Sequence, residues 1–314
     1  MVESKNQWKA WVYLAPAIIL LLIFTVYPII NTVRISFLEN YNPVEAIGGA
    51  KYTFGIKNFS KVIEYKGFLN CLKNTMLLCV LTVPISTFLA LLIAVCLNSI
   101  KPLSRFLQTI YFLPYVTNSI AIGMVFYAMF NMVGNIGTDA QIITTAGIVN
   151  NIIGVFGIEP VNWINPGSSY VANIAVMVIY IVWNALPFKI LILLGGLQSV
   201  NKQYYDAAKV DGTSRARVFW RITVPLLSPM LAYVIITGFI GGFKEYSSIV
   251  GIYGEGMGPK GDAGRLNTMV GFIYTAIEKD KNYGRASAAA LILFGIILIV
   301  TLINLYVSKK KVHY

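Results

Sequence analysis

Six long apolar stretches constrain this chain more than any other feature of its sequence. They lie at about 11–37, 72–97, 106–130, 171–197, 222–248 and 286–307. About 20 mostly apolar residues are enough for an α-helix to cross the hydrocarbon core of a bilayer. A helix also satisfies its own backbone hydrogen bonds in lipid, where no water can do so. The pattern therefore predicts an all-α integral membrane protein, with six transmembrane helices in a single domain over residues 1–314.

The composition agrees with this prediction. Hydrophobic residues make up 57% of the chain and charged residues only 12%, about half the quarter that is typical of soluble domains. This balance excludes a disordered chain and a typical soluble enzyme. The three cysteines are odd in number, and two of them, Cys79 and Cys96, lie within one apolar stretch. We expect them to be packing residues rather than a disulfide framework.

The basic residues indicate how the helices are oriented. The net charge is +12, and with the N-terminus inside, the inner segments 1–10, 99–105, 198–221 and 308–314 hold 12 Lys and Arg in 48 residues. The outer segments 38–70, 132–170 and 249–285 hold 9 in 109. Since Lys and Arg are enriched on the cytoplasmic side, both termini are predicted to be cytoplasmic. The same distribution favours contact with membrane lipid over a nucleic-acid partner. The first apolar stretch is too long for a signal peptide, so we expect it to be retained.

The inner segment from 198 to 221 differs from the other cytoplasmic loops. Asn201 is suited to cap a short helix, Asp211-Gly212 predicts a turn, and Thr213 or Ser214 can cap a second helix that leads into the fifth span. Aromatic side chains follow one another along it: Tyr204, Tyr205, Phe219 and Trp220. Aromatic residues beside arginine indicate either the lipid interface or a groove in a partner protein, and the pattern leaves both open.

A family resemblance bears on that choice. Asp206-Ala207-Ala208, Gly212 six residues after Asp206, and then Ile222 and Val224-Pro225 resemble the EAA loop of binding-protein-dependent ABC importer permeases. Asp206 replaces the usual Glu and Val224 the usual Leu, and both changes keep the chemical character. Further segments resemble the sugar-permease branch, which includes the maltose and glycerol-phosphate permeases: LAPAIILLLIFTVYPIINTVRISF, RFLQTIYFLPYVTNSIA, VNWINP and NYGRASAAALILF.

The resemblance implies a type I ABC importer permease fold in the plasma (inner) membrane of a prokaryote. It implies four partners besides lipid: a second homologous permease, a cytoplasmic ABC ATPase dimer, an extracytoplasmic solute-binding protein and a sugar substrate. In this family the EAA loop forms a coupling helix seated in a cleft of the ATPase. Disaccharides, oligosaccharides and glycerol phosphate all stay open as the solute.

The coupling residues can be given roles on that basis. Asp206 is the expected polar contact to the ATPase, Ala207 and Ala208 keep the helix face small, and Gly212 permits a tight turn. The chain has no GxxxxGK[ST] loop, so we expect ATP to be hydrolysed on another subunit. No catalytic residue, cofactor or metal is predicted, and the only histidine is His313 near the end of the chain.

The predicted substrate pathway follows polar residues at membrane depth, where such groups are costly and indicate function by default. By resemblance, the segment 113–119 matches a sugar-contacting stretch of the maltose permease, which favours Tyr115 and Ser119. Counting along the helices places further residues near them: Asn184, Phe188, Gly242 and Glu245. Other interpretations stay open, because Tyr115 could be interfacial, Glu245 could lie near the outer surface, and Gly242 with Gly238 could serve helix packing.

Two other classes of protein compete with the importer. An ion-coupled transporter would need intramembrane carboxylates, and Glu245 is the only acidic residue in a predicted span. An intramembrane enzyme would need a catalytic constellation, and the sequence offers none that we can identify. Neither class explains the loop from 198 to 221.

Overall fold

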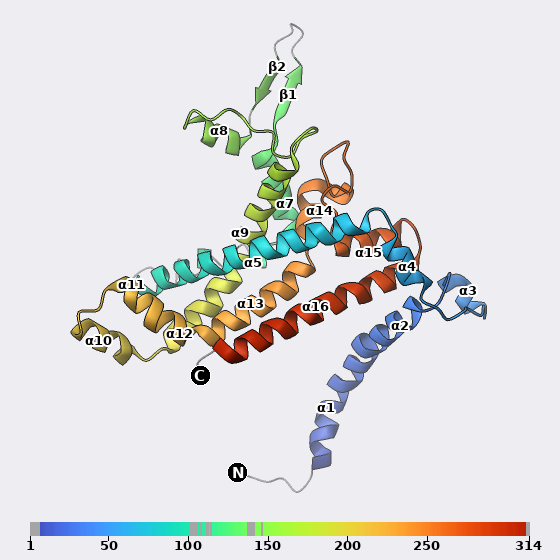
Figure 1. The fold of residues 1–314 in the computed structure, drawn as a ribbon, viewed down its shortest axis with the longest axis horizontal. Coiled ribbons are helices and arrows are strands. Elements are labelled where there is room, and N and C mark those ends of the chain that lie inside the picture. The colour runs from blue at the N-terminus through green and yellow to red at the C-terminus, as the bar shows by residue number, and fades with distance from the viewer. Residues whose placement is uncertain are drawn as a thin grey trace. The chain divides into compact units, whose positions relative to one another are not determined.

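The computed structural model describes residues 7–100, 106, 109, 110, 113, 115–136, 142–145 and 147–311. Its packing divides the chain into two compact units (Figure 1). The first contains the residues up to Phe68 together with 272–294, and the second contains 69–271 and 295–314. Each unit is described by itself.

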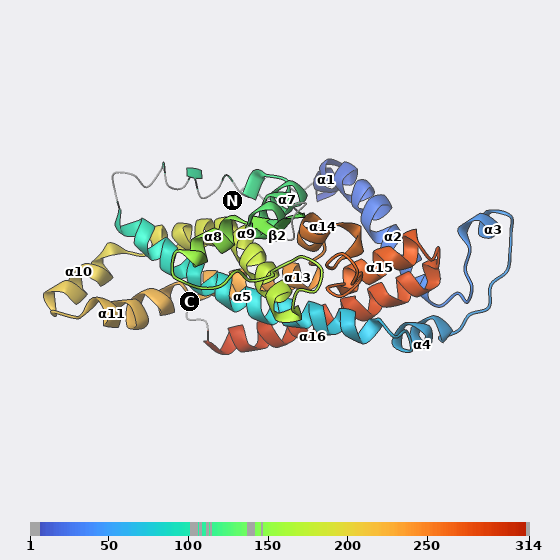
Figure 2. The same cartoon turned by 90° about the horizontal axis from the view of Figure 1, so that it is seen from above.

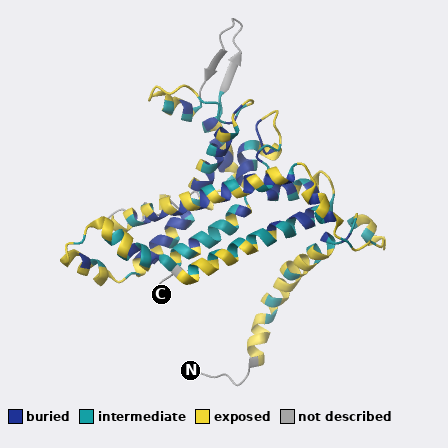
Figure 3. Cartoon of the chain, in the orientation of Figure 1, coloured by how far each residue is buried: buried dark blue, intermediate teal, exposed yellow. Residues whose placement is uncertain are grey.

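The first unit begins with one long apolar helix. It consists of α1 (Gln7–Leu21), a π-helical turn η1 (Leu22–Val26) and α2 (Tyr27–Ser36). The π turn precedes Pro28, whose ring lacks an N–H and disturbs the hydrogen bonds of the preceding turn. Figure 3 draws α1 without buried residues, as expected for an apolar helix that faces lipid or another subunit.

The remainder of the first unit packs around two polar side chains. Its short helices are α3 (Pro43–Ile47) and α4 (Lys57–Ile63). Buried Asn58 on α4 donates to the backbone oxygens of Ser36 and Leu38 at 3.0 and 2.9 Å. The Arg285 guanidinium lies 5.0 Å from the ring centre of Tyr65 and also pairs with Asp280. These contacts connect residues distant in sequence in a region with little apolar core.

The second unit holds most of the helices and the larger core. Its elements are α5 (Phe68–Ser99), α7 (Ser119–Phe130), β1 (Val133–Ile136), β2 (Ile142–Thr145), α8 (Ile148–Gly154), α9 (Tyr170–Ser199), α10 (Lys202–Val210), α11 (Arg215–Val218), η2 (Phe219–Thr223), α12 (Val224–Leu226), α13 (Ser228–Phe243), α14 (Ser247–Tyr253) and η3 (Gly254–Gly256). Two further helices pass from one unit into the other, α15 (Met269–Glu278) and α16 (Tyr283–Lys311).

Four helices are long and apolar enough to cross a membrane: Trp8–Ser36, Phe68–Ser99, Tyr170–Ser199 and Tyr283–Lys310. They match the first, second, fourth and sixth predicted stretches to within a few residues. The chain is therefore a helical, multi-pass membrane protein, as predicted. The antiparallel hairpin β1–β2, which pairs Val133 with Thr145, was not predicted.

The third and fifth stretches are less regular than predicted. In the third, α7 covers the second half, and much of 101–114, including Pro114, lies outside the described residues. In the fifth, the helices Arg215–Leu226 and Ser228–Phe243 meet at an angle of 69°. Pro225 and Pro229 flank this bend, and each removes a backbone donor from the helix. The second of these helices ends at Phe243, before the predicted boundary at 248.

Two apolar clusters hold the second unit together. One is built around Met177, Tyr180 and Ile249, and the other around Leu193, Leu227 and Val234. Each of these six side chains is at most 1% exposed. Along α5 and α9 the two clusters are separated by a segment that is richer in polar and small residues.

Helices α7 and α14 cross closely because glycine meets glycine. A Cβ atom added to Gly123 would lie 2.6 Å from the Gly251 backbone, and one added to Gly251 would lie 3.1 Å from the Cα of Gly123. The first distance is shorter than real Cβ contacts and the second is shorter than most of them, so a side chain at either position must displace its neighbour. Close approach at small residues is a common way for membrane helices to pack.

A buried ammonium group joins α9 to α5. Lys189 Nζ donates to Ser86 Oγ at 2.7 Å, Thr87 Oγ1 at 2.9 Å and the Val83 carbonyl at 3.3 Å. All three ammonium hydrogens therefore have acceptors on α5. A Cβ atom at Gly238 would lie 3.2 Å from Nζ, so this glycine on α13 makes room for the group. We call Lys189, Ser86 and Thr87 the ammonium clamp.

We expect Gly251→Val to separate α7 from α14. The added side chain must displace backbone, which typically costs about 1–3 kcal/mol. Thermal unfolding of the purified protein in detergent would then show a lower Tm. Gly195→Ala on α9 is the matched control, because no atom lies within 4 Å of its added Cβ. Equal Tm values for the two variants would contradict the tight crossing.

Removing the two hydroxyl acceptors of the ammonium clamp should lower the stability of the protein more than removing the whole clamp does. In Ser86→Ala/Thr87→Val the buried charge keeps only the Val83 carbonyl, and stranding such a charge costs about 3–5 kcal/mol. Adding Lys189→Met to that double variant removes the stranded charge and should restore most of the stability. Tm measurements on the four proteins form the double-mutant cycle. If Lys189→Met restores nothing, the clamp does not hold the charge as described.

Candidate functional site

A cavity of about 280 Å³ lies in the second unit between the two apolar clusters. It is bounded by α5, α9, α13 and the residues that precede α7. Five of the six predicted substrate-pathway residues line it: Tyr115, Asn184, Phe188, Gly242 and Glu245. The structure therefore brings together residues that lie up to 130 positions apart in the sequence.

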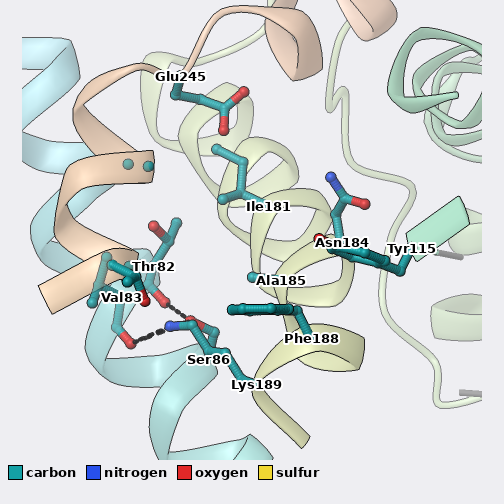
Figure 4. A pocket seen from close by; sticks show the side chains of 14 residues that line it. Thr82, Val83, Ser86, Tyr115, Ile181, Asn184, Ala185, Phe188, Lys189 and Glu245 are labelled. Carbon is teal, nitrogen blue, oxygen red and sulfur yellow. Dashed lines mark hydrogen bonds between the residues drawn. The ribbon is translucent and has the colours of Figure 1, made fainter. Parts of the chain in front are cut away.

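The lining combines flat aromatic surface with a few polar groups. The rings of Tyr115 and Phe188 are stacked, with centroids 5.7 Å apart and an angle of 17° between planes. Figure 4 shows Glu245 and Lys189 toward opposite ends of the cavity, with Asn184 beside Tyr115. Aromatic faces can pack on the apolar faces of a sugar ring, while amide and carboxylate groups bind hydroxyls.

Ser119 is the predicted residue that does not line this cavity. Its hydroxyl lies 3.0 Å from the hydroxyl of fully buried Tyr180, which also donates to the Ser119 carbonyl at 2.6 Å. Ser119 follows Asn118, whose side chain accepts from the Ile120 backbone nitrogen and caps α7. Its contacts join the beginning of α7 to α9.

Glu245 lies in a break in the helix rather than within a span. The fifth predicted span runs to 248 and includes Glu245, but α13 ends at Phe243. One Glu245 carboxylate oxygen accepts from the Ser248 backbone nitrogen at 3.2 Å, in the first turn of α14. Lys244 is exposed and does not line the cavity. The break thus turns the acidic side chain toward the cavity while its basic neighbour remains outside.

The neighbouring glycines of α13 have different surroundings. A Cβ atom on Gly242 would lie 2.8 Å from Cys79 Sγ on α5, and one on Gly238 would lie 3.1 Å from Val83 Cγ1. Both therefore allow close packing of α13 on α5, as the small-residue spacing indicated. A Cβ atom on Gly241 would meet nothing within 4 Å, although Gly241 also lines the cavity. Gly241 is the glycine that keeps space open.

Two cavity residues on α5, Thr82 and Ser86, were missed by the sequence analysis. They lie four residues apart on either side of Pro84, in an otherwise apolar helix. That spacing puts both on one helical face, and it could have pointed to them. Ser86 also belongs to the ammonium clamp, so the clamp forms part of the cavity wall.

The segment after α9 forms the predicted first helix and turn, whereas Ser214 precedes α11 without a side-chain cap hydrogen bond. The Asn201 side chain accepts from the Gln203 backbone nitrogen at 3.0 Å and caps α10. At the other end, the backbone nitrogens of Gly212 and Thr213 donate to the Lys209 and Ala208 carbonyls. This pair of bonds is a Schellman motif, and it requires a left-handed residue. Gly212 supplies it with a φ of 62°.

Helix α10 exposes most of its surface. Tyr204 is 55% exposed and Val210 is 89% exposed, and Asp206 forms a solvent-exposed ion pair with Lys209 at 3.0 Å. The two alanines face differently, since Ala208 is buried and Ala207 is exposed. Figures 1 and 2 both show α10 and α11 at one end of the second unit. This helix presents a small apolar and charged surface that the unit itself leaves uncovered.

The comparisons with known proteins agree on the kind of chain this is. Residues 84–313 match the family described as binding-protein-dependent transport system inner membrane component. The arabinooligosaccharides transport system permease protein AraP of Halalkalibacterium halodurans is 29% identical over 95% of this chain and 87% of its own length. The sn-glycerol-3-phosphate transport system permease protein UgpA of Agrobacterium fabrum is 28% identical over 100% of this chain and 99% of its own.

A solved structure has the same fold. It is a bacterial alginate ABC transporter in complex with an alginate pentasaccharide-bound periplasmic protein. One of its chains matches with a TM-score of 0.75 and 21% identity, over 98% of this chain and 96% of that one. The resemblance inferred from the loop 198–221 is thus confirmed at the level of family and fold. Proteins of this kind are transport subunits and not catalytic. The chain belongs to the binding-protein-dependent transport system inner membrane component family, the permeases of ABC importers.

Proposed function

We propose that this chain is the permease subunit of an ATP-driven importer for a sugar, in the plasma membrane of a prokaryote. It supplies half of the translocation pathway, and a second, homologous permease supplies the other half. A cytoplasmic ABC ATPase dimer provides the energy, and an extracytoplasmic binding protein delivers the solute. Residues 1–314 act as one permease domain with six transmembrane helices and both termini in the cytoplasm.

The observation that carries this proposal is the uncovered helix α10 in a chain without a nucleotide-binding loop. Its sequence carries Asp206, Ala207, Ala208 and Gly212 in the spacing of the coupling loop. Ala207 and Tyr204 are exposed and would contact the ATPase, whereas buried Ala208 would hold α10 against its own unit. The ion pair to Lys209 keeps the Asp206 carboxylate at the surface, where it can exchange that partner for one on the ATPase.

The carbohydrate nature of the solute is supported by the cavity and by the relatives. Stacked aromatic rings beside an amide and a carboxylate suit a sugar, as described above. Of the two relatives, AraP is named for arabinooligosaccharides, which are carbohydrates, whereas UgpA is named for sn-glycerol 3-phosphate, a polyol phosphate. We propose Tyr115, Asn184, Phe188 and Glu245 as solute contacts, with Gly242 and Ser119 shaping the pathway by helix packing.

The competing classes fit the observations less well. A secondary transporter coupled to ions would use Glu245 for coupling, yet this carboxylate accepts a backbone hydrogen bond that caps α14. Neither that class nor an intramembrane enzyme gives α10 a role. We therefore retain the importer subunit as the single proposal.

The coupling role can be tested with Gly212→Val in the assembled transporter reconstituted in vesicles. A β-branched side chain does not tolerate a φ of 62°, so the turn after α10 should deform. We expect solute uptake to fall at least about tenfold while binding of the solute-loaded binding protein is retained.

Gly157→Val is the matched control for this coupling variant. Gly157 also has a positive φ, 75°, with no atom near its added Cβ, but it lies in the loop before α9. Full uptake in the Gly212 variant, or equal loss in both variants, would contradict a coupling role that is specific to α10.

The substrate cavity can be tested with Tyr115→Leu and Glu245→Gln. An aromatic stacking contact and a hydrogen bond are each worth about 1 kcal/mol, so each variant should lose roughly fivefold in the apparent affinity for uptake. Tyr233→Leu and Glu255→Gln are the controls, since neither residue lines the cavity. Transport kinetics that are normal in both cavity variants would refute this assignment.

A further inference from the structure

A second and larger cavity, of about 640 Å³, lies in the same unit and has no part in the predicted pathway. It is lined by α7, α14, the turn at Ile164–Pro166 and the loop at Gly258–Lys260. None of the proposed solute contacts line it. Its assignment to a ligand rests on the proposed function.

We call this second cavity the outer cavity and the cavity of about 280 Å³ the inner cavity. The lining of the outer cavity has the chemistry of a carbohydrate site. Tyr127 and Tyr253 provide aromatic rings, and Asn131 and Asn165 provide side-chain amides. Lys260 is the one charged residue among its lining residues, and it is exposed. Rings that pack on sugar faces and amides that bind hydroxyls are suited to a neutral sugar unit. A cation at the rim also accommodates an acidic unit.

The two amides are held in a defined orientation. Asn165 Nδ2 donates to Asn131 Oδ1 at 2.7 Å and to the Met132 carbonyl at 2.9 Å, and Asn165 Oδ1 accepts from the Met132 nitrogen at 3.0 Å. Because the Asn131 oxygen is engaged, its NH₂ group is the end that is left to bind something else. This group has no hydrogen-bond acceptor within the described part of the chain. A preorganised donor on a cavity wall is what specific binding of a hydroxyl requires.

Two segments of the chain contribute to both the inner and the outer cavity. The segment 115–131 passes from the inner to the outer one, as does the segment that leads from Glu245 through α14. Between them lie the glycine crossing of Gly123 with Gly251 and the contact of Ser119 with Tyr180. The two cavities thus follow one another along the chain segments 115–131 and 245–254, with the glycine crossing, which includes the outer-cavity residue Gly251, as the partition.

We infer that the outer cavity is a second carbohydrate subsite, which binds one sugar unit of a neutral or acidic oligosaccharide whose leading end lies in the inner cavity. The solute is accordingly an oligosaccharide rather than a single sugar. Binding at the outer subsite adds affinity only for chains long enough to reach across the partition.

The test uses the complete transporter in vesicles and a graded series of chain lengths. The probes are neutral malto- and arabino-oligosaccharides and acidic alginate oligosaccharides, each from two to five units, with glycerol 3-phosphate as a single-unit solute. The variant is Asn131→Asp, which keeps the oxygen that Asn165 requires and removes the NH₂ donor. Asn151→Asp is the matched control, because Asn151 is exposed on α8 and makes the same change of charge outside the cavity.

We expect KM for uptake of the longest transported chains to rise about fivefold in Asn131→Asp, the value of one lost hydrogen bond. Uptake of the two-unit solute should stay within about twofold of the unmodified transporter, and Asn151→Asp should change neither. Copurification of the other subunits confirms assembly of each variant.

The remaining outcomes separate this inference from the proposed function. If the unmodified transporter carries none of the carbohydrates, the sugar-importer proposal itself is wrong and the subsite falls with it. If it carries them but Asn131→Asp has the same effect at every length, or no effect, the subsite is overturned and the importer proposal stands. Transport of glycerol 3-phosphate alone also overturns the oligosaccharide subsite.

Discussion

The structure depends first on the cost of an unsatisfied polar group in an apolar medium. A helix meets this condition for its own backbone, but prolines at 28, 84, 187, 225 and 229 each remove one donor. The chain responds with a π turn before Pro28 and a bend of 69° between Pro225 and Pro229. The most polar side chain within α9, Lys189, meets the same condition with three oxygens of α5. These oxygens of α5, together with Gly238 of α13 beside the ammonium group, determine where α5, α9 and α13 approach one another.

Close approach at glycine is the second principle of the packing. Gly238 and Gly242 bring α13 against α5, and Gly123 with Gly251 brings α7 against α14. Between these close contacts, the residues that face the interior of the helix bundle are polar or small. They leave space there, whereas the large side chains of the two apolar clusters fill the interior elsewhere. The inner cavity lies in this interval, and it collects Tyr115, Phe188 and Glu245 from three different segments. The candidate site is therefore a consequence of how the helices are spaced.

The ends of helix α10 are set by its local sequence, whereas the cavity depends on contacts between distant helices. Its beginning and end are set by local hydrogen bonds of Asn201 and Gly212, and buried Ala208 packs it against its own unit. Local capping keeps a short helix formed while leaving most of its surface free. A helix formed in this way suits a docking element, because association with a partner does not have to order it first.

Local patterns determined much of this protein from its sequence. The apolar stretches identified four long helices to within a few residues, and the spacing of Asp206 to Pro225 identified the family. Both signals are short-range and repeat a known geometry. The tertiary structure decided what depends on contacts between distant segments. Helix α13 ends at Phe243, which turns Glu245 toward the cavity, and Ser119 bonds to Tyr180 instead of lining it. The spacing of Thr82 and Ser86 places both on one face of α5, but they join the site because Lys189 and the glycines of α13 hold α5 close. The sequence of α5 alone does not reveal those neighbours.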